Sequence, residues 1–316
     1  MENSSTVTKF ILIGFSSSVE KQMVIFWTFL LIYGVALVGN FLIILAISVC
    51  RKLHTPMYFL LINLSFINVS SISIIVPKLL QILLTQRKTI VFPGCIAQVF
   101  LFTLTLGTEL LLLAFMAFDR YAAICQPLQY TVIMRKEVCF GTMSGLWLIG
   151  IINSSIQTGL VLRLSFCDSN IINHFFCYLP PMFKISCSDT SLNEIMVFAA
   201  SIVIAIGSCT LTFLSYWFIL RSIFRIRSTE GKKKAFSTCS SHLLVVSFYY
   251  STIIYTFLRP ASMYSLEEDK VIAIIYSVVT PVLNPLIYSL RNTDVKQALR
   301  KLSMKYTMAI NILLCL

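Results

Sequence analysis

The most regular feature of this sequence is a series of long apolar stretches separated by short polar ones. Stretches with few charged residues span about 23–49, 57–84, 94–118, 138–162, 194–220, 235–258 and 271–290. An α-helix of about 20 residues crosses the hydrocarbon core of a bilayer. Because lipid offers no partner to backbone polar groups, such stretches cross as helices. The pattern predicts an all-α integral membrane protein with a seven-helix bundle at 23–290, an N-terminal tail at 1–22 and a C-terminal segment at 291–316.

Composition and charge support this prediction. Hydrophobic residues make up 57% of the chain and charged residues only 12%, about half the usual charged fraction of a soluble domain. The net charge of +12 would indicate nucleic acid in a soluble protein. In a membrane protein, basic residues gather in cytoplasmic loops, so we expect no nucleic-acid partner.

The distribution of Lys and Arg gives the orientation. With the N-terminus placed outside, sixteen of these residues lie on the inner side and eight on the outer side. This bias predicts an extracellular N-terminus on a multi-pass protein of the plasma membrane. Asn3 begins a glycosylation sequon in the same outer tail. A cysteine-rich loop between the fourth and fifth spans also falls outside, where disulfides persist.

Four cysteines are predicted to face the outer side, namely Cys95, Cys167, Cys177 and Cys187. Four cysteines allow three pairings, and spacing alone does not select one of them. The other cysteines lie in spans or inside. They form no CxxC metal motif, and the three histidines form no ligand cluster.

Polar residues within the spans are the candidates for function, because ionisable groups at membrane depth are costly. Glu109 is the one carboxylate near the middle of a span. It is either paired with a cation, or neutral and hydrogen-bonded to Asn or Ser on neighbouring helices. Asn40, Asn68 and Asn284 also lie in spans, where amides more often join helices than contact a ligand.

Asp119 and Arg120 form an adjacent charge pair where the third span ends. Two readings are open. An exposed pair contributes about 0–1 kcal/mol, whereas a pair that breaks when helices move acts as a switch.

Other classes of membrane protein fit less well. A transporter would show internal repeats and matching broken helices, and a channel would show pore-lining repeats. An enzyme would carry a nucleophile with its base, or a metal cluster. We see none of these patterns in the sequence and expect no enzyme activity and no cofactor.

Several long motifs resemble those of one family. They are LHTPMYFLLINLS at 53–65, MAFDRYAAICQPLQY at 116–130, HFFC at 174–177, KAFSTCSSHL at 234–243 and PVLNPLIYSLRN at 281–292. Together they resemble the signatures of odorant (olfactory) receptors, which are rhodopsin-like G-protein-coupled receptors. The resemblance runs from about Phe10 to Leu302 in the family's order and spacing.

The resemblance implies both a fold and a function. The fold is a rhodopsin-like seven-helix bundle with a short amphipathic eighth helix. The function is to bind an odorant and activate the stimulatory olfactory G protein, which raises cyclic AMP, with a chaperone for surface trafficking. A chemosensory receptor used outside the nose is the alternative within the family, and a transporter is the more distant one.

The resemblance also assigns roles to single residues. Asp119 would hold Arg120 at rest, and activation would free Arg120 to contact the G protein. Tyr216 and Tyr288 would then support Arg120, and Asn284 and Pro285 belong to the motif that carries Tyr288. The implied disulfides are Cys95–Cys177 and Cys167–Cys187.

The ligand pocket implied by the resemblance lies between the third, fifth and sixth spans. The residues expected to line it are Phe102, Thr103, Leu106, Gly107, Ala200, Ser201, Ile204, Tyr250, Ile253, Ile254 and Phe257. None is charged, so we expect a small neutral ligand with about one hydrogen-bonding group. Thr103, Ser201 and Tyr250 are the expected partners of that group.

One departure from the family pattern affects a cation site. Asn68 stands where such receptors usually carry Asp, which helps to hold a sodium ion together with a carboxylate equivalent to Glu109. With one carboxylate in place of two, we expect at most a weak sodium site at Glu109 and Asn68.

Overall fold

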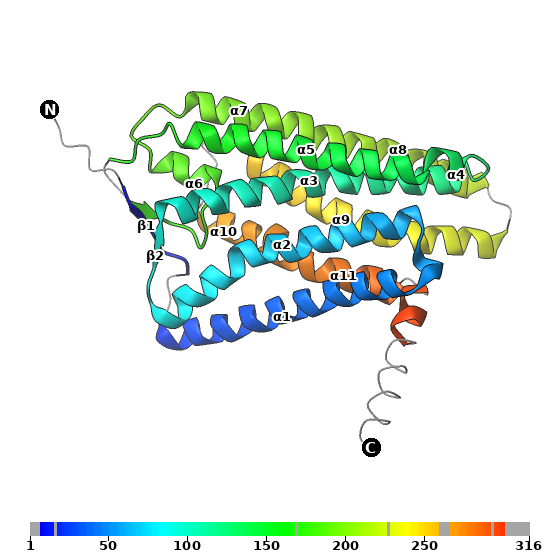
Figure 1. Ribbon diagram of the computed structural model, residues 1–316, viewed down its shortest axis with the longest axis horizontal. Coiled ribbons are helices and arrows are strands. Elements are labelled where there is room, and N and C mark those ends of the chain that lie inside the picture. Colours follow the sequence, from blue (N-terminus) through cyan, green and yellow to red (C-terminus); the bar gives the residue numbers. More distant parts are fainter. Residues whose placement is uncertain are drawn as a thin grey trace, which may run out of the picture.

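The computed structural model describes residues 7–15, 18–167, 170–225, 228–258, 266–291 and 294–300. These residues form a bundle of long helices with a small β-sheet at one end (Figure 1). We call this the sheet end. The opposite end carries the short helix α4 (Tyr130–Ile133) and is called the Arg120 end.

The first four long helices are α1 (Val19–Val49), α2 (Pro56–Thr85), α3 (Phe92–Cys125) and α5 (Lys136–Val161), with a single 3₁₀ turn, η1 (Arg51–Leu53), between α1 and α2. The fifth is continuous through α7 (Ser191–Ser201), the π-helix η2 (Ile202–Ile206) and α8 (Gly207–Arg225). The sixth is α9 (Thr229–Leu258), and the seventh runs through α10 (Leu266–Ile274), the π-helix η4 (Ile275–Val279) and α11 (Thr280–Arg291). Residues 294–300 are also helical.

Within the described residues, six of these seven helices are apolar enough over 18 residues to count as membrane spans. The seventh, α9, has 30 residues, which at about 1.5 Å per residue also exceeds the hydrocarbon thickness. The predicted all-α, seven-helix membrane fold is confirmed. Each helix extends beyond the stretch expected from the sequence at one end or both, and α5 begins two residues before 138 and ends one residue before 162.

The helix α3 lies at the centre of the bundle, in contact with α2, α5, α8 and α9 (Figure 1). Its burial follows this position, since Thr108, Glu109 and Leu112 are at most 2% exposed. By contrast, α1 carries a row of exposed apolar side chains, as expected of a helix that faces lipid. The polar side chains of α3 are therefore the ones that the bundle encloses.

A side-chain hydrogen bond links α1 to α11 at a carbonyl that lacks its backbone partner. Pro285 has no N–H, so the carbonyl of Pro281, four residues earlier, lacks its helical partner. The Nδ2 of Asn40 on α1 donates to this carbonyl at 3.0 Å and to the Ala36 carbonyl at 2.8 Å. Asn40 therefore joins two helices, as predicted for an amide within a membrane span.

The sheet end is closed by three short strands, β1 (Lys9–Leu12), β2 (Thr89–Val91) and β3 (Ile171–Ile172). The central strand β1 pairs antiparallel with β2 and parallel with β3. Phe10 and Leu12 are fully buried beneath the sheet. The N-terminal segment, expected to be a simple tail, is thus part of the packed structure from Lys9 onward.

Candidate functional site

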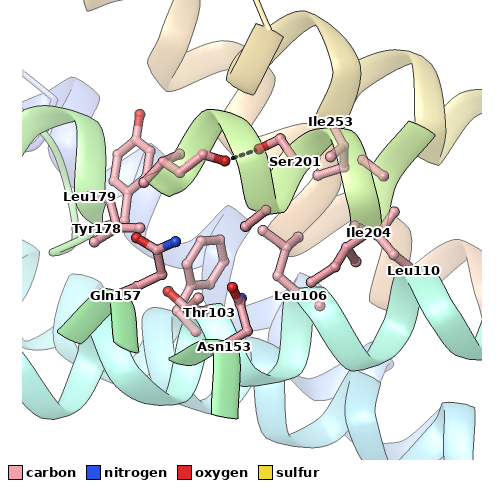
Figure 2. Close-up of a pocket in the computed structure, with 15 residues that line it drawn as sticks. Thr103, Leu106, Leu110, Asn153, Gln157, Tyr178, Leu179, Ser201, Ile204 and Ile253 are labelled. Atoms are coloured by element: carbon pink, nitrogen blue, oxygen red, sulfur yellow. Dashed lines mark hydrogen bonds between the residues drawn. The ribbon is translucent and has the colours of Figure 1, made fainter. Parts of the chain in front are cut away.

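A cavity of about 540 Å³ lies between α3, α5, α6 (Leu179–Lys184), the α7–η2 helix and α9, in the half of the bundle nearer the sheet (Figure 2). Its lining is formed by Phe102, Thr103, Leu106, Gly107, Leu110, Asn153, Gln157, Tyr178, Leu179, Val197, Ala200, Ser201, Ile204, Ala205 and Ile253. No charged side chain is among these lining residues of the described chain.

The structure brings together eight of the eleven side chains expected at the pocket. These are Phe102, Thr103, Leu106, Gly107, Ala200, Ser201, Ile204 and Ile253. Tyr250 and Ile254 lie on α9 outside the lining. The side chain of Phe257 lies outside the described residues.

Tyr250 lies apart from the cavity because its hydroxyl is used inside the bundle. It donates to the Leu110 carbonyl at 3.1 Å and lies 3.2 Å from the Thr212 hydroxyl. Of the three expected hydrogen-bonding residues, the structure therefore leaves Thr103 and Ser201 at the cavity. Ser201 donates to the Val197 carbonyl at 2.8 Å (Figure 2), so its oxygen remains as an acceptor.

Sequence reasoning missed the contribution of the fourth long helix. Asn153 and Gln157 on α5 both line the cavity. The signal was available, because two amides four residues apart share one face of a helix in a stretch that is otherwise largely apolar. Leu110, Val197 and Ala205 were also missed, and each lies near a predicted residue on the same helix.

The other missed residues, Tyr178 and Leu179, come from the loop between α5 and α7, in which Leu179 begins the short helix α6. A disulfide between Cys95 and Cys177, with an S–S length of 2.09 Å, joins this loop to the start of α3. Gln98 accepts a hydrogen bond from the Cys177 N–H at 2.8 Å and donates to the Ile74 carbonyl at 2.8 Å. These links hold Tyr178 over Phe102, with ring centroids 6.3 Å apart.

The structure contains both disulfides that the resemblance implies. The second, Cys167–Cys187, closes the loop on itself. His174 lies between Cys167 and Cys177 in the sequence of this loop. It is fully buried and stacks on Phe175, with ring centroids 4.4 Å apart. Burial, together with the charge of nearby Lys270, lowers the pKa of His174 to about 3. The loop is therefore a packed cover with a neutral imidazole in its core.

At the Arg120 end, the charge pair is enclosed rather than exposed. The Asp119 side chain is 1% exposed and the Arg120 side chain 14%. Arg120 donates to Asp119 Oδ2 from Nε at 2.9 Å and also from Nη2. The hydroxyl of Tyr130 on α4 donates to the other oxygen, Oδ1, at 2.8 Å. This geometry excludes the reading of a solvent-exposed surface pair.

Tyr216 on α8 lies near the same end and faces α9. Its hydroxyl lies 2.7 Å from His242 Nδ1 and donates to the Cys239 carbonyl at 3.4 Å. The side chain of Tyr288 lies outside the described residues. The structure thus places Asp119 and Arg120 together and gives Tyr216 partners on α9.

Amides connect three helices in the middle of the bundle. Asn284 Nδ2 donates to Asn68 Oδ1 at 3.1 Å, and Asn68 Nδ2 donates to Asn40 Oδ1 at 3.3 Å. Glu109 accepts a hydrogen bond from the Tyr249 hydroxyl at 2.8 Å. All four of the residues Asn40, Asn68, Glu109 and Asn284 are at most 2% exposed.

These groups fit a sodium ion poorly. Both ends of the Asn68 amide are used within the network. Among the described buried atoms of this region, Glu109 Oε1 and Asn284 Oδ1 have no hydrogen-bond partner. Two oxygens with one carboxylate charge are a weaker cation site than the usual pair of carboxylates, in line with the expectation from Asn68.

Asn3 and residues 301–316 lie outside the described residues. The helical residues 294–300 fall where an eighth helix was expected, and Lys52 forms an exposed ion pair with Asp294 at 2.9 Å.

Comparison with known proteins gives one consistent result. The sequence profile of the family described as "Olfactory receptor" matches residues 29–305. Human "Olfactory receptor 13G1" is 49% identical over 299 residues, which cover 95% of this chain and 97% of the relative. Mouse "Olfactory receptor 5AP2" is 49% identical over 96% of both chains, and chicken "Olfactory receptor-like protein COR4" is 49% identical over 95% of this chain and 96% of the relative.

Proposed function

Since the chain belongs to the olfactory receptor family, we propose that it binds small neutral odorants in the cavity between α3, α5, η2 and α9. It is a multi-pass membrane receptor of the G-protein-coupled class and not an enzyme. The observation that carries the proposal is the uncharged lining of the 540 Å³ cavity. An amine would require a carboxylate in that lining and a carboxylic acid would require a Lys or Arg, because a buried charge is costly without its partner.

The proposed response follows from the two ends of the bundle. Ligand at the sheet end shifts the helices, the Asp119–Arg120 pair opens, and Arg120 binds the stimulatory olfactory G protein, so that cyclic AMP rises. The pair is suited to this role because Asp119 is enclosed and held by both Arg120 and Tyr130. We expect the Asp119–Arg120 pair to be either closed or open, which are the two states that a switch requires.

The proposed orientation places the sheet end and Asn3 outside the cell and the Arg120 end in the cytoplasm. The protein would act in the plasma membrane, with a chaperone for surface trafficking. The excess of Lys and Arg on the loops of the Arg120 end supports this orientation, and the two disulfides at the sheet end suit an oxidising exterior.

The test is a cyclic-AMP reporter assay in cells that express the receptor with the olfactory G protein and the trafficking chaperone. The panel consists of neutral volatile compounds, with amines and carboxylic acids as comparison. Arg120→Ala should abolish every response. Leu106→Phe, which fills the cavity, should weaken responses at least tenfold, since pocket volume changes of this size are worth about 1–3 kcal/mol.

The matched control for the cavity is Leu101→Phe. Leu101 lies on α3 five residues away, is 42% exposed and faces away from the cavity. Equal effects of the two phenylalanine variants would contradict the proposed pocket. Amines or acids as the best agonists would contradict the neutral ligand.

A further inference from the structure

Gln157 is a cavity-wall residue whose side-chain amide has one hydrogen-bonded end and one unpaired end among the described residues. Its side chain is 3% exposed. Nε2 donates to the Met196 carbonyl at 3.1 Å, whereas Oε1 is buried without a hydrogen-bond partner among the described residues. A buried acceptor without a donor is costly, so such a group points to a partner beyond the described residues.

The direction of this amide follows from chemistry. A backbone carbonyl only accepts, so the NH₂ end of Gln157 must be the end that faces Met196. Met196 lines a second groove between α5 and α7, which shares part of its lining with the cavity, and Met196 is absent from the cavity lining. Gln157 lines both spaces. Because Gln157 is a lining residue of the cavity, its unpaired Oε1 lies in the cavity wall.

The neighbouring polar groups complete the site. The Ser201 hydroxyl donates its hydrogen bond to the Val197 carbonyl, so its oxygen is a second acceptor in the cavity. Thr103 also lines the cavity, and its hydroxyl can rotate to donate or to accept. The cavity therefore offers two fixed acceptors, one adaptable hydroxyl and the amide of Asn153, which can donate and accept (Figure 2).

We propose that Gln157 accepts a hydrogen bond from the hydroxyl of the ligand, so that the preferred ligands are neutral alcohols or phenols. The inference deepens the proposed function and rests on it, because the ligand must occupy this cavity. A hydroxyl can donate to Gln157 and at the same time accept from Thr103. A ketone, aldehyde, ester or ether only accepts and leaves Oε1 unpaired.

The expected preference is substantial. A site that holds a buried polar group rejects an analogue that cannot pair with it far better than an apolar pocket rejects a small change in size. For one neutral hydrogen bond we expect an alcohol to be about tenfold more potent than the ketone or methyl ether of the same carbon skeleton.

The test compares matched ligands on the intact receptor in the reporter cells. The probes are straight-chain alcohols of about six to nine carbons, small ligands of the class proposed for the cavity, together with terpene alcohols and phenols. Each is paired with its methyl ether and, where it exists, its aldehyde or ketone. In Gln157→Met, the potency of the alcohol should fall about tenfold to that of its partner, while the partner's potency stays unchanged.

Thr158→Val is the matched control. Thr158 is the next residue on α5, is 7% exposed and likewise has a buried hydroxyl without a partner, but it does not line the cavity. Its variant should keep the alcohol preference. Surface amounts are measured with an N-terminal tag, and Gln157→Leu replaces the methionine variant if that variant does not reach the surface.

The outcomes separate this inference from the proposed function. An alcohol preference that survives both Gln157 variants overturns the inference, as do ketones or ethers that outperform their alcohols on the parent receptor. If Leu106→Phe still weakens all ligands in that case, the cavity remains the binding site. If Leu106→Phe has no effect, the cavity itself is refuted.

Discussion

Tyr130→Phe tests whether the enclosed charge pair is a switch. The change removes one hydroxyl, which donates to Asp119 Oδ1 at 2.8 Å, and leaves the ring in place. Burial and the neighbouring Asp119 charge raise the pKa of Tyr130 above its ordinary value. The phenol therefore stays protonated and donates at every physiological pH.

The size of the effect follows from the partner's charge. A hydrogen bond to a charged group contributes about 1.5–3 kcal/mol. If the bond exists in the resting state and is lost on activation, its removal shifts the equilibrium about tenfold to a hundredfold, since 1.4 kcal/mol is tenfold. A resting receptor with about 1% in the active state would then have between about 10% and one half. Partial exposure of Tyr130 favours the lower figure.

The assay is cyclic AMP without ligand, normalised to the amount of receptor at the surface. Tyr121→Phe is the matched control, because Tyr121 also lies at the Arg120 end but its hydroxyl accepts from Gln126 at 3.2 Å and not from the charge pair. Basal signalling should rise in the Tyr130 variant alone, and Arg120→Ala should cancel the rise. Unchanged basal signalling at equal surface amounts would refute the reasoning.

Three further predictions concern the core and the loop. Asn68→Asp gives the amide network a second carboxylate, so added sodium should suppress signalling more strongly than in the parent; equal sodium responses in both forms would count against it. A Cβ at Gly150 would overlap side chains of α3, whereas no atom of the described residues beyond its own helix turn lies within 4 Å of one at Gly145. Gly150→Ala should therefore cost about 1–3 kcal/mol and lower surface expression, and Gly145→Ala should not. The pKa of His174 is lowered to about 3 in the folded loop. Below about pH 6.5 the imidazole therefore binds a proton in the unfolded chain but stays neutral in the folded one. Stability should thus fall as pH drops from 6.5 toward 5, and thermal unfolding of the purified receptor should show a smaller loss in His174→Phe.

Much of the site was predictable from local sequence. Predicted pocket residues on α3, such as Phe102 and Leu106, lie at helical spacing below Cys95. Residues spaced three and four apart on one helix share a face whatever the rest of the chain does. The family resemblance indicated which face of α3 lines the pocket, and helical spacing from Cys95 then gave the residues of that face.

The role of the fourth helix was not predictable in the same way. Gln157 and Asn153 share a face of α5, but the rotation of that face toward the cavity depends on how α5 packs against α3 and α7. The same limit applies to Tyr250, whose hydroxyl is taken by the Leu110 carbonyl. Both outcomes depend on contacts between residues far apart in the chain.

The sequence by itself determined that this chain is a helical membrane bundle of one receptor family, because hydrocarbon forces each apolar stretch into a helix and the family motifs are local. The tertiary structure decided which polar groups meet. It brought Tyr178 over the cavity through Cys177, enclosed Asp119 beneath Tyr130, and left the oxygen of Gln157 without a donor in the described part of the chain. These pairings depend on helix rotation and loop closure, which packing sets and which no local run of residues encodes.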